Sequence, residues 1–360
     1  AAIAREANVR GVSFEPMAGA AEAAMRAEIA DNNMESVALE KAPRVAVYIP
    51  PNTPPWDDAV TLALEYADIP YTKLWDEEVV RGDLTNPATL RGSADGVTVV
   101  FHLAARVTDS GPLAAFRAIT VDGTRHLLEV CRGAGIRRFV YFSSFTALGF
   151  SRDTVGLDEQ AACVKTGIPY SDTKAEAEVL VADLGRRYGI PFTIIRPANV
   201  IGAGSLWARD VLDALSRGPM PIIGDGTAPG AFVHVQNLVD GAVLAAESEQ
   251  AEGRTYHLID DYPVTWAEYL STLGSWIGRR PRGRIPTALA WQIGALAERI
   301  SLLLGTRPPA SRIAAGIMGR NHMVSSRLAR EQLGWTPRVT YPEAMTEIRE
   351  WFEAVYRPPS

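Results

Sequence analysis

Between residues 44 and 202 the chain alternates short apolar runs with longer segments of helical spacing. The apolar runs predict strands at 45–49, 71–75, 97–103, 139–142 and 192–195, and the helical spacing predicts helices at 56–66, 120–132 and 171–188. The run at 97–103 is apolar throughout, which is typical of a strand covered on both faces of a sheet. Because strands and helices alternate, we expect right-handed βαβ units and an α/β fold with a doubly wound parallel sheet.

The pattern divides the chain into three parts. Residues 1–42 are rich in Ala and Glu and predict an N-terminal helical extension, and residues 43–202 predict an α/β domain of dinucleotide-binding type with an atypical first βαβ unit. The pattern of residues 203–360 is less regular, with proline-rich breaks at 219–221, 281–286 and 308–309. We interpret 203–360 as a smaller C-terminal substrate-capping region, from which 232–258 partly returns to the core.

Composition narrows the classes of protein. The 360 residues are 47% hydrophobic and 22% charged, as in an ordinary soluble globular chain. The net charge of −6 excludes a generally basic surface for nucleic acid. The two cysteines, Cys131 and Cys163, form no CxxC motif, so we expect neither a disulfide scaffold nor a metal site. The sequence has no basic-then-apolar leader and no run of ~18 apolar residues, and we expect a cytoplasmic protein.

A tyrosine and a lysine four residues apart carry the candidate chemistry. Tyr170 directly precedes the predicted helix at 171–188, and Lys174 lies one turn into it, so both side chains share a face. An ammonium group near a phenol favours the phenolate and lowers its pKa, which allows proton transfer. Only four of the 36 basic residues are lysines, so a retained lysine indicates a role that arginine cannot fill. Ser144 follows the strand predicted at 139–142, where open α/β sheets bind ligands.

At these residues the chain resembles the extended short-chain dehydrogenase/reductase family, above all its 3β-hydroxysteroid dehydrogenase-like and NAD-dependent epimerase/dehydratase members. The similarity runs from about residue 80 to 352, and its motifs follow in order. They are RGDL at 81–84, VFHLAA at 100–105, VDGT at 121–124, the segment 139–149, YSDTK at 170–174, RPANV at 196–200, FVHV at 232–235 and LGWTP at 333–337. The resemblance implies a Rossmann-like fold.

The resemblance also implies roles for single residues. Tyr170 would be the acid/base, Lys174 its partner and a ligand of the nicotinamide ribose, and Ser144 would orient the reacting oxygen. The cofactor is implied to be NAD or NADP, with NAD preferred. Besides Tyr170 and Lys174, the residues implied to contact it are Asp83, Leu84, Leu103, Ala104, Ala105, Ser143, Pro197 and Val200.

The first βαβ unit departs from the family, which carries a GxxGxxG loop there. Residues 50–58 contain four prolines and two aspartates, and no glycine lies between Gly19 and Gly82. Proline removes amide donors, and carboxylates would repel a pyrophosphate at the helix start. Residues 1–79 therefore do not match the family. If the geometry is kept, Asp76 or Glu77 at the end of the second strand would reach the adenosine ribose. Thr120 replaces the usual Asn, and Gln236-Asn237 replace a more common acidic pair.

Other candidates have ordinary and functional interpretations. We expect His102 and His234 to be core residues rather than metal ligands. Arg279, Arg280, Arg282 and Arg284 predict either a solvated loop or a phosphate or anionic-lipid contact. Apolar residues at 289, 293, 296, 300 and 303 form a stripe on a helix, which predicts packing, a lipophilic substrate wall or peripheral membrane contact through 286–304. The helices at 115–132 and 171–188 offer a homodimer interface.

Three functions fit these observations. The first is an NAD(P)-dependent oxidoreductase that transfers hydride at a secondary alcohol or ketone of a sterol-like or other lipophilic small molecule. The second is a nucleotide-sugar epimerase or dehydratase. The third is a non-catalytic Rossmann-fold binding protein that lacks a glycine-rich phosphate loop.

Overall fold

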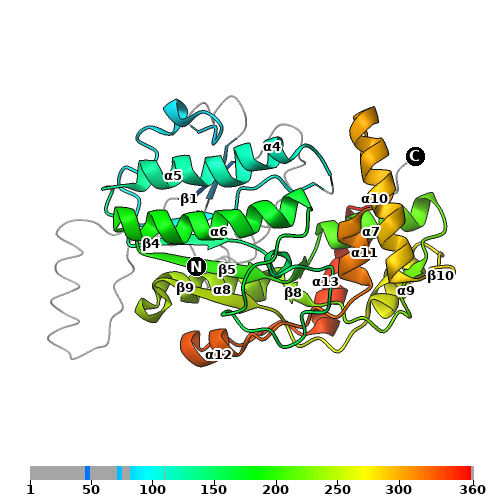
Figure 1. Cartoon of the computed structure of the whole chain (residues 1–360). Helices are drawn as coiled ribbons and strands as arrows, with labels where there is room; N and C mark the ends of the chain where they lie inside the picture. The colour runs from blue at the N-terminus through cyan, green and yellow to red at the C-terminus, as the bar shows by residue number, and fades with distance from the viewer. Residues whose placement is uncertain (1–44, 49–70, 75–81, 109, 358–360) are drawn as a thin grey trace, which may run out of the picture.

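The central element is a four-stranded parallel sheet, seen in a computed structural model that describes residues 45–48, 71–74, 82–108 and 110–357 (Figure 1). Its strand order is β3–β4–β5–β9, with all three pairings parallel. The strands span β3 Val99–His102, β4 Arg138–Phe142, β5 Phe192–Pro197 and β9 Arg254–Leu258. A second parallel pair joins β1 (Val45–Tyr48) to β2 (Tyr71–Leu74). The predicted parallel α/β sheet is confirmed.

Helices cover both faces of this sheet (Figure 1). Two of them, α5 (Gly123–Cys131) and α6 (Pro169–Tyr188), pack on one face, and α8 (Val235–Glu247) packs on the other. Alternate residues of β4 enter the two cores, because successive strand side chains point to opposite faces. Phe139 and Tyr141 join the cluster under α5 and α6, whereas Val140 and Phe142 join the cluster that contains α8.

Strand β3 is less covered than the sequence suggested. All five residues of β4 are buried, but in β3 only His102 is buried and Phe101 is 43% exposed. The prediction of a strand covered on both faces is therefore wrong for β3 over its described residues. An apolar run shows that a strand is hydrophobic, but it does not show how many other elements pack against that strand.

Helix α6 begins at Pro169, so Tyr170 lies inside its first turn rather than before it. Proline suits this position because the first helical N–H has no partner within the helix. Asp172 stabilises the start of the helix by accepting hydrogen bonds from the N–H groups of Thr166 (2.7 Å) and Gly167 (3.0 Å). The predicted helix at 120–132 is also present, but its beginning is a π-helical segment, η2 (Arg117–Asp122), that follows α4 (Leu113–Phe116) and leads into α5.

The remaining elements complete the fold. The elements α7 (Leu206–Arg217), α9 (Trp266–Trp276), β10 (Arg284–Ile285), α10 (Thr287–Leu304) and α11 (Arg312–Met318) gather at one end of the molecule, and β9 brings the segment 232–258 back into the central sheet (Figure 1). No helix in the described part of the chain combines the length and hydropathy needed to cross a membrane. The short helices are η1 (Pro87–Leu90), η3 (Phe145–Leu148) and η4 (Glu249–Ala251), and the further strands are β6 (Asn199–Ile201), β7 (Ile222–Ile223), β8 (Phe232–His234) and β10 (Arg284–Ile285). The further helices are α7 (Leu206–Arg217), α9 (Trp266–Trp276), α10 (Thr287–Leu304), α11 (Arg312–Met318), α12 (Arg327–Leu333) and α13 (Tyr341–Ala354).

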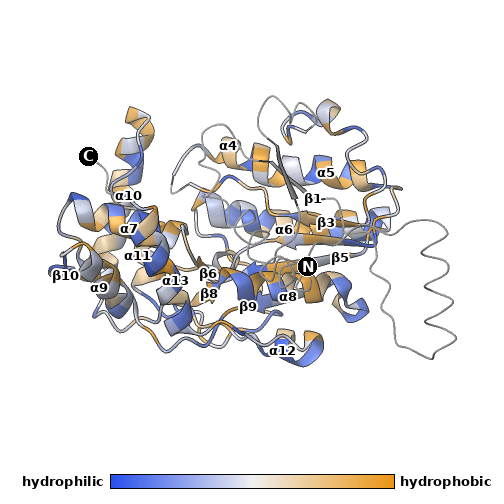
Figure 2. Cartoon of the chain, turned by 180° about the vertical axis from the view of Figure 1, so that it is seen from behind, coloured by the Kyte–Doolittle hydropathy of each residue, from blue (hydrophilic) through white to orange (hydrophobic). Residues whose placement is uncertain are grey.

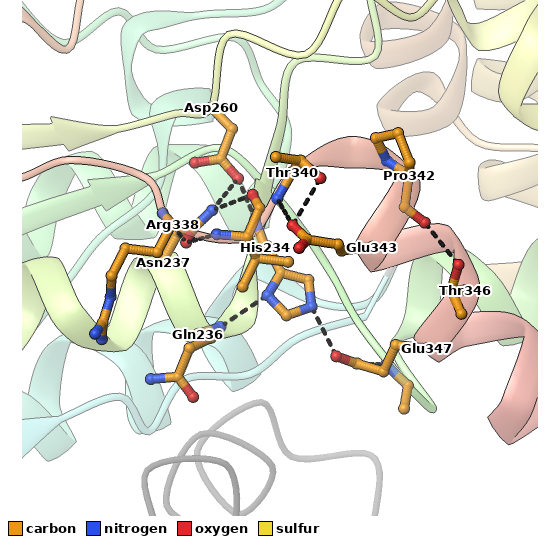
Figure 3. A network of polar contacts seen from close by, with 12 residues as sticks. His234, Gln236, Asn237, Asp260, Arg338, Thr340, Pro342, Glu343, Thr346 and Glu347 are labelled. Atoms are coloured by element: carbon orange, nitrogen blue, oxygen red, sulfur yellow. Dashed lines mark hydrogen bonds and ion pairs between the residues drawn. The ribbon is translucent and has the colours of Figure 1, made fainter.

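Asn237 at the start of α8 fixes the segment that leads into α13 (Figure 3). Its Nδ2 donates to Asp260 Oδ2 (2.9 Å) and to the carbonyl of Val339 (3.0 Å). Its Oδ1 accepts from the N–H groups of Arg338 (2.9 Å) and Val339 (3.0 Å). This fully buried position needs both donors and acceptors, which explains why an amide stands where an acidic residue is more common.

We expect Asn237→Asp to destabilise the protein by about 2–4 kcal/mol, because the new carboxylate would face Asp260 and the Val339 carbonyl without a proton to donate. The loss should shrink in acid, where the carboxyl takes up a proton. Chemical denaturation at pH 7 and pH 5 measures both effects. The matched control is Asn321→Asp, since Asn321 Oδ1 accepts from Met323 N–H in a local turn. Equal stability of the two variants would contradict this account.

Candidate active site

The candidate site lies at the carboxyl ends of β3, β4 and β5. Leu103, Ser143 and Ala198 directly follow these strands, and the N–H of Ser143 donates to the Ile195 carbonyl at 2.7 Å, which ties the first turn after β4 to β5. Parallel sheets place ligands at this edge, where strand ends leave backbone groups and side chains free of the sheet. The structure thus brings together segments that lie far apart in the sequence.

Lys174 is buried beneath this edge. Its Nζ donates to the Phe142 carbonyl at 2.6 Å and lies 5.2 Å from the centre of the Tyr141 ring, and the residue is only 3% exposed. Burial lowers the pKa of Lys174 to about 7, against the opposing effect of the Glu178 carboxylate. The amine is therefore fixed at the end of β4 and changes its charge near neutral pH.

Tyr170 lies one turn before Lys174, half-buried, and its phenol lies near Ser144. Burial raises the pKa of the phenol, and the Ser144 hydroxyl acts in the opposite direction. The expected lowering of this pKa by Lys174 is not seen. The physical reason is that the amine donates to the Phe142 carbonyl and is only partly charged near pH 7.

Ser144 is set up to donate a hydrogen bond. Its Oγ accepts from the N–H of Thr146 at 3.2 Å and from Thr146 Oγ1 at 2.9 Å, as it caps the short helix η3. A hydroxyl oxygen that already accepts twice retains its own proton for a further partner. That partner can be the Tyr170 phenol or an oxygen of a bound substrate.

Sequence reasoning missed a buried ion pair one turn beyond Lys174. Glu178 accepts from Arg196 Nε (2.9 Å) and Nη2 (2.7 Å), and both side chains are about 5% exposed. The thiol of Cys163 donates to Glu178 (3.3 Å), and burial raises its pKa to about 12. His257 lies 3.3 Å from Arg196, and burial lowers its pKa to about 4. Glu178 could have been found from the sequence, because it lies four residues after Lys174 as Lys174 lies four after Tyr170, so the three share one face of the helix.

The two histidines singled out from the sequence are core residues, as predicted. His102 Nε2 lies 2.8 Å from Thr124 Oγ1, and burial lowers its pKa to about 3. His234 is 1% exposed, accepts from the N–H of Gln236 (3.2 Å) and faces Glu347 at 3.2 Å (Figure 3). Within the described ranges no three His, Cys, Asp or Glu side chains are grouped to hold a metal ion.

Thr120 occupies the position where the family usually has Asn. Its Oγ1 accepts from the N–H of Arg106 at 3.2 Å, and its carbonyl accepts from Thr124 Oγ1 at 2.6 Å. Thr124 in turn contacts His102, so the π-helical turn η2 is joined to the end of β3 through two threonines and a histidine. The hydroxyl of Thr120 thus holds the loop after β3.

The residues near the strand ends fit the nicotinamide half of a dinucleotide. The Oγ of Ser143 is buried and lacks a hydrogen-bond partner within the described chain, so it is available to a polar ligand group. Ala104 is exposed, and the neighbouring candidates are half-buried with small or apolar side chains that allow a flat ring to approach. These half-buried candidates are Leu103, Ala105, Pro197 and Val200.

The residues predicted to contact the adenosine half of the cofactor are only partly among the described residues. Asp83 is exposed, and its Oδ1 accepts from the N–H and hydroxyl of Thr85. Leu84 packs against Gly123, where an added Cβ would come within 2.9 Å of Leu84 Cβ. Asp76, Glu77 and the predicted loop at 50–58 lie outside the described residues, as do the helical extension expected at 1–42 and the helix expected at 56–66.

Comparisons with known proteins agree with this geometry. Residues 49–258 match the NAD dependent epimerase/dehydratase family. The prediction that residues 1–79 lie outside the family is therefore wrong for residues 49–79, where the match holds without a glycine-rich loop. A ketoreductase of 4-hydroxy-2-methyl-3-oxo-4-farnesyl-3,4-dihydroquinoline-1-oxide from Stigmatella aurantiaca is 30% identical over 276 residues, 75% of this chain and 82% of that protein. The decarboxylating sterol-4-alpha-carboxylate 3-dehydrogenase of Mus musculus is 28% identical and covers 75% of this chain and 78% of its own.

A solved structure shares the fold. The dTDP-glucose 4,6-dehydratase DesIV from Streptomyces venezuelae, solved with NAD and TYD bound, superposes with a TM-score of 0.62 at 20% identity and covers 88% of this chain and 89% of its own. The chain belongs to the NAD-dependent epimerase/dehydratase family. The prediction of an NAD(P)-dependent dehydrogenase or reductase of the extended short-chain dehydrogenase/reductase type is confirmed.

The buried amine predicts a pH-dependent effect of Lys174→Met on stability. In the folded protein the amine keeps its proton only below about pH 7, whereas in the unfolded chain it keeps it to about pH 10. Burial of the ammonium is therefore costly below pH 7, and the cost disappears as the pH rises toward 10. The wild type should therefore gain stability relative to Lys174→Met as the pH rises from 6.5 to 9.5, by up to roughly 1.4 kcal/mol in the free energy of unfolding per pH unit. In the measurement, the melting temperature of Lys174→Met minus that of the wild type should fall over this range.

The control for this measurement is Lys165→Met, which removes an exposed lysine. Its melting temperature should follow the wild type at every pH. Calorimetric scans of the cofactor-free proteins give the three curves, and parallel curves for Lys174→Met and the wild type would contradict a titrating buried amine.

Proposed function

We propose that this member of the epimerase/dehydratase family is an oxidoreductase that transfers hydride between NAD and a carbonyl or carbinol carbon of a lipophilic small molecule. The observation that carries the proposal is the meeting of Ser144, Tyr170 and Lys174 at the ends of β4 and α6, where the amine of Lys174 donates to the Phe142 carbonyl. The bound dinucleotide supplies the hydride donor or acceptor.

Each of the three side chains has a separate task. Ser144 donates a hydrogen bond to the reacting oxygen of the substrate, with its own Oγ held by Thr146, and so positions that oxygen beside the phenol. Tyr170 passes a proton to or from that oxygen. Lys174 holds the ribose next to the nicotinamide and, when charged, stabilises the phenolate. Its amine is already oriented toward this edge by the Phe142 carbonyl.

The protonation state of Tyr170 favours ketone reduction at neutral pH. Burial raises the pKa of the phenol, so it carries its proton at pH 7 and is ready to donate it to a developing alkoxide. Oxidation of an alcohol needs the phenolate instead and should become faster as the pH rises.

The substrate class rests on the relatives. The two proteins at 28–30% identity are named for a farnesylated quinoline oxide and for a sterol carboxylate, both large and lipophilic. The sugar-nucleotide enzyme at 20% identity supports the fold alone. We also propose NAD rather than NADP, which agrees with the description of the family, and we assign the capping of the substrate to residues 203–360.

We expect Tyr170→Phe to reduce turnover about 10²–10⁴-fold, because the proton donor is lost, while the affinity for NADH changes less than about twofold. The matched control is Tyr188→Phe, which removes a phenolic hydroxyl at the other end of α6 and should leave turnover unchanged. Assays use a 3-ketosteroid and a 2-alkyl-3-oxo acid with NADH and NADPH in parallel. Unchanged turnover in Tyr170→Phe would reject the assignment.

A fluorescence titration separates this proposal from a non-catalytic one. Energy transfer from the eight tryptophans to NADH reports binding directly. Saturable binding without turnover by the wild type would support a binding protein, and no saturable signal at millimolar cofactor would exclude dinucleotide chemistry altogether.

We further propose a homodimer through α5 and α6. Their outer face has a shallow hollow of about 560 Å³ lined by Val121, Arg125, Glu176 and Val179 among others, and Val179 is 68% exposed. A second copy of this face would cover these apolar side chains.

Val179→Asp should convert the dimer into a monomer, because it places a charge in the centre of the proposed contact. Light scattering after gel filtration measures the mass. Val155→Asp alters a similarly exposed valine outside the two helices and should leave the mass unchanged. A wild-type monomer, or a dimer that persists in Val179→Asp, would contradict the interface.

A further inference from the structure

Helix α10 exposes its hydrophobic side. Five residues at helical spacing share one face, here called the α10 stripe, and each is more than 40% exposed, with Leu303 at 86%. Figure 1 shows the helix projecting from the end of the molecule, and Figure 2 shows hydrophobic colour along the projecting turns. The α10 stripe consists of Leu289, Ile293, Leu296, Ile300 and Leu303.

The opposite side of α10 carries small or polar residues, and this side packs on the rest of the protein. Gly294 lies so close to α11 that an added Cβ would come within 2.6 Å of the Ser311 carbonyl carbon. The buried Glu298 accepts from the N–H of Arg312 at 2.6 Å and from its Nε at 2.7 Å. The usual arrangement of an amphipathic helix is therefore inverted, and the interpretation of the stripe as packing against the capping region is wrong.

Positive charge accompanies the α10 stripe. Arg279, Arg280, Arg282 and Arg284 precede the helix and are all exposed, and Arg299 is exposed on the helix itself. From residue 277 to 307 the sequence has six arginines and a single acidic residue, and that residue is Glu298, which is paired with Arg312 on the inner side. A chain of net charge −6 thus concentrates arginine in the segment that leads into α10 and forms it.

We propose that the α10 stripe and the arginines at 279–284 bind the surface of an anionic lipid bilayer, with α10 lying along the headgroup region. Leucine and isoleucine on one face of a helix enter the acyl boundary, while neighbouring arginines contact lipid phosphates. A second copy of this chain fits less well, because it would bring the same cluster of positive charge against the first. The inference does not depend on the reaction catalysed at Tyr170.

Vesicle sedimentation tests the proposal with the full chain. The wild type should pellet with phosphatidylcholine vesicles that contain about 30% phosphatidylglycerol, and far less with pure phosphatidylcholine or in high salt. A triple variant, Leu296→Ser with Ile300→Ser and Leu303→Ser, should lower the partition coefficient at least about tenfold. Each Arg→Gln change at 279–284 should lower it about fivefold.

The matched control is Leu302→Ser, since Leu302 is 53% exposed on the same helix but lies outside the stripe. Its partition coefficient should equal that of the wild type. Melting temperature and NADH affinity verify that every variant is folded. The proposal is overturned if the wild type stays in the supernatant with anionic vesicles, or if the triple variant binds them as the wild type does. It is also overturned if the triple variant binds no vesicles but changes a dimer into a monomer, because a second copy would then cover the stripe.

Discussion

The position of α6 against the sheet depends on two buried titratable side chains on one face of the helix, an amine and a carboxylate. Lys174 donates to the carbonyl at the end of β4, and one turn later Glu178 accepts from Arg196 on β5. A buried charge without a partner costs several kcal/mol, so neither contact can be given up cheaply. Together they fix the helix along two neighbouring strands, and Tyr170, one turn before Lys174, is thereby held beside Ser144.

The same burial that positions the site also sets its protonation. Removal of water lowers the pKa of the Lys174 amine and raises the pKa of the Tyr170 phenol, so both groups move toward their neutral forms. A simple pairing of ammonium with phenolate, as the spacing of the two residues suggests, would require both to be charged in a site that disfavours charge. In the protein without ligands the neighbouring Ser144 hydroxyl is the group that lowers the phenol pKa.

The sequence was sufficient to predict features that depend on the order of residues within one segment, such as a helix face or a buried strand. The spacing of Tyr170 and Lys174 and the apolar runs of β4 and β5 identified the sheet and the centre of the site. Properties that arise between segments were not visible in the sequence. Arg196 and Glu178 pair across 18 residues, and the amide of Asn237 bridges to Val339 across 102 residues. The exposure of β3 depends on neighbours that its own apolar run does not specify.

Helix α10 shows the limit of periodicity most directly, because a stripe in the sequence does not tell which side faces the protein. The inner side was decided by Gly294 and Glu298, since a glycine permits the close approach of α11 and a carboxylate satisfies Arg312 there. Arg312 also reaches the carbonyl of Gly167, three residues before Tyr170, and Trp291 of α10 lies 6.1 Å from the ring of Phe150. Helices α10 and α11 thus contact the two ends of the segment 149–168 that precedes Tyr170, α10 through Trp291 and α11 through Arg312. A lipid surface bound at α10 would therefore lie against a helix that packs on this segment.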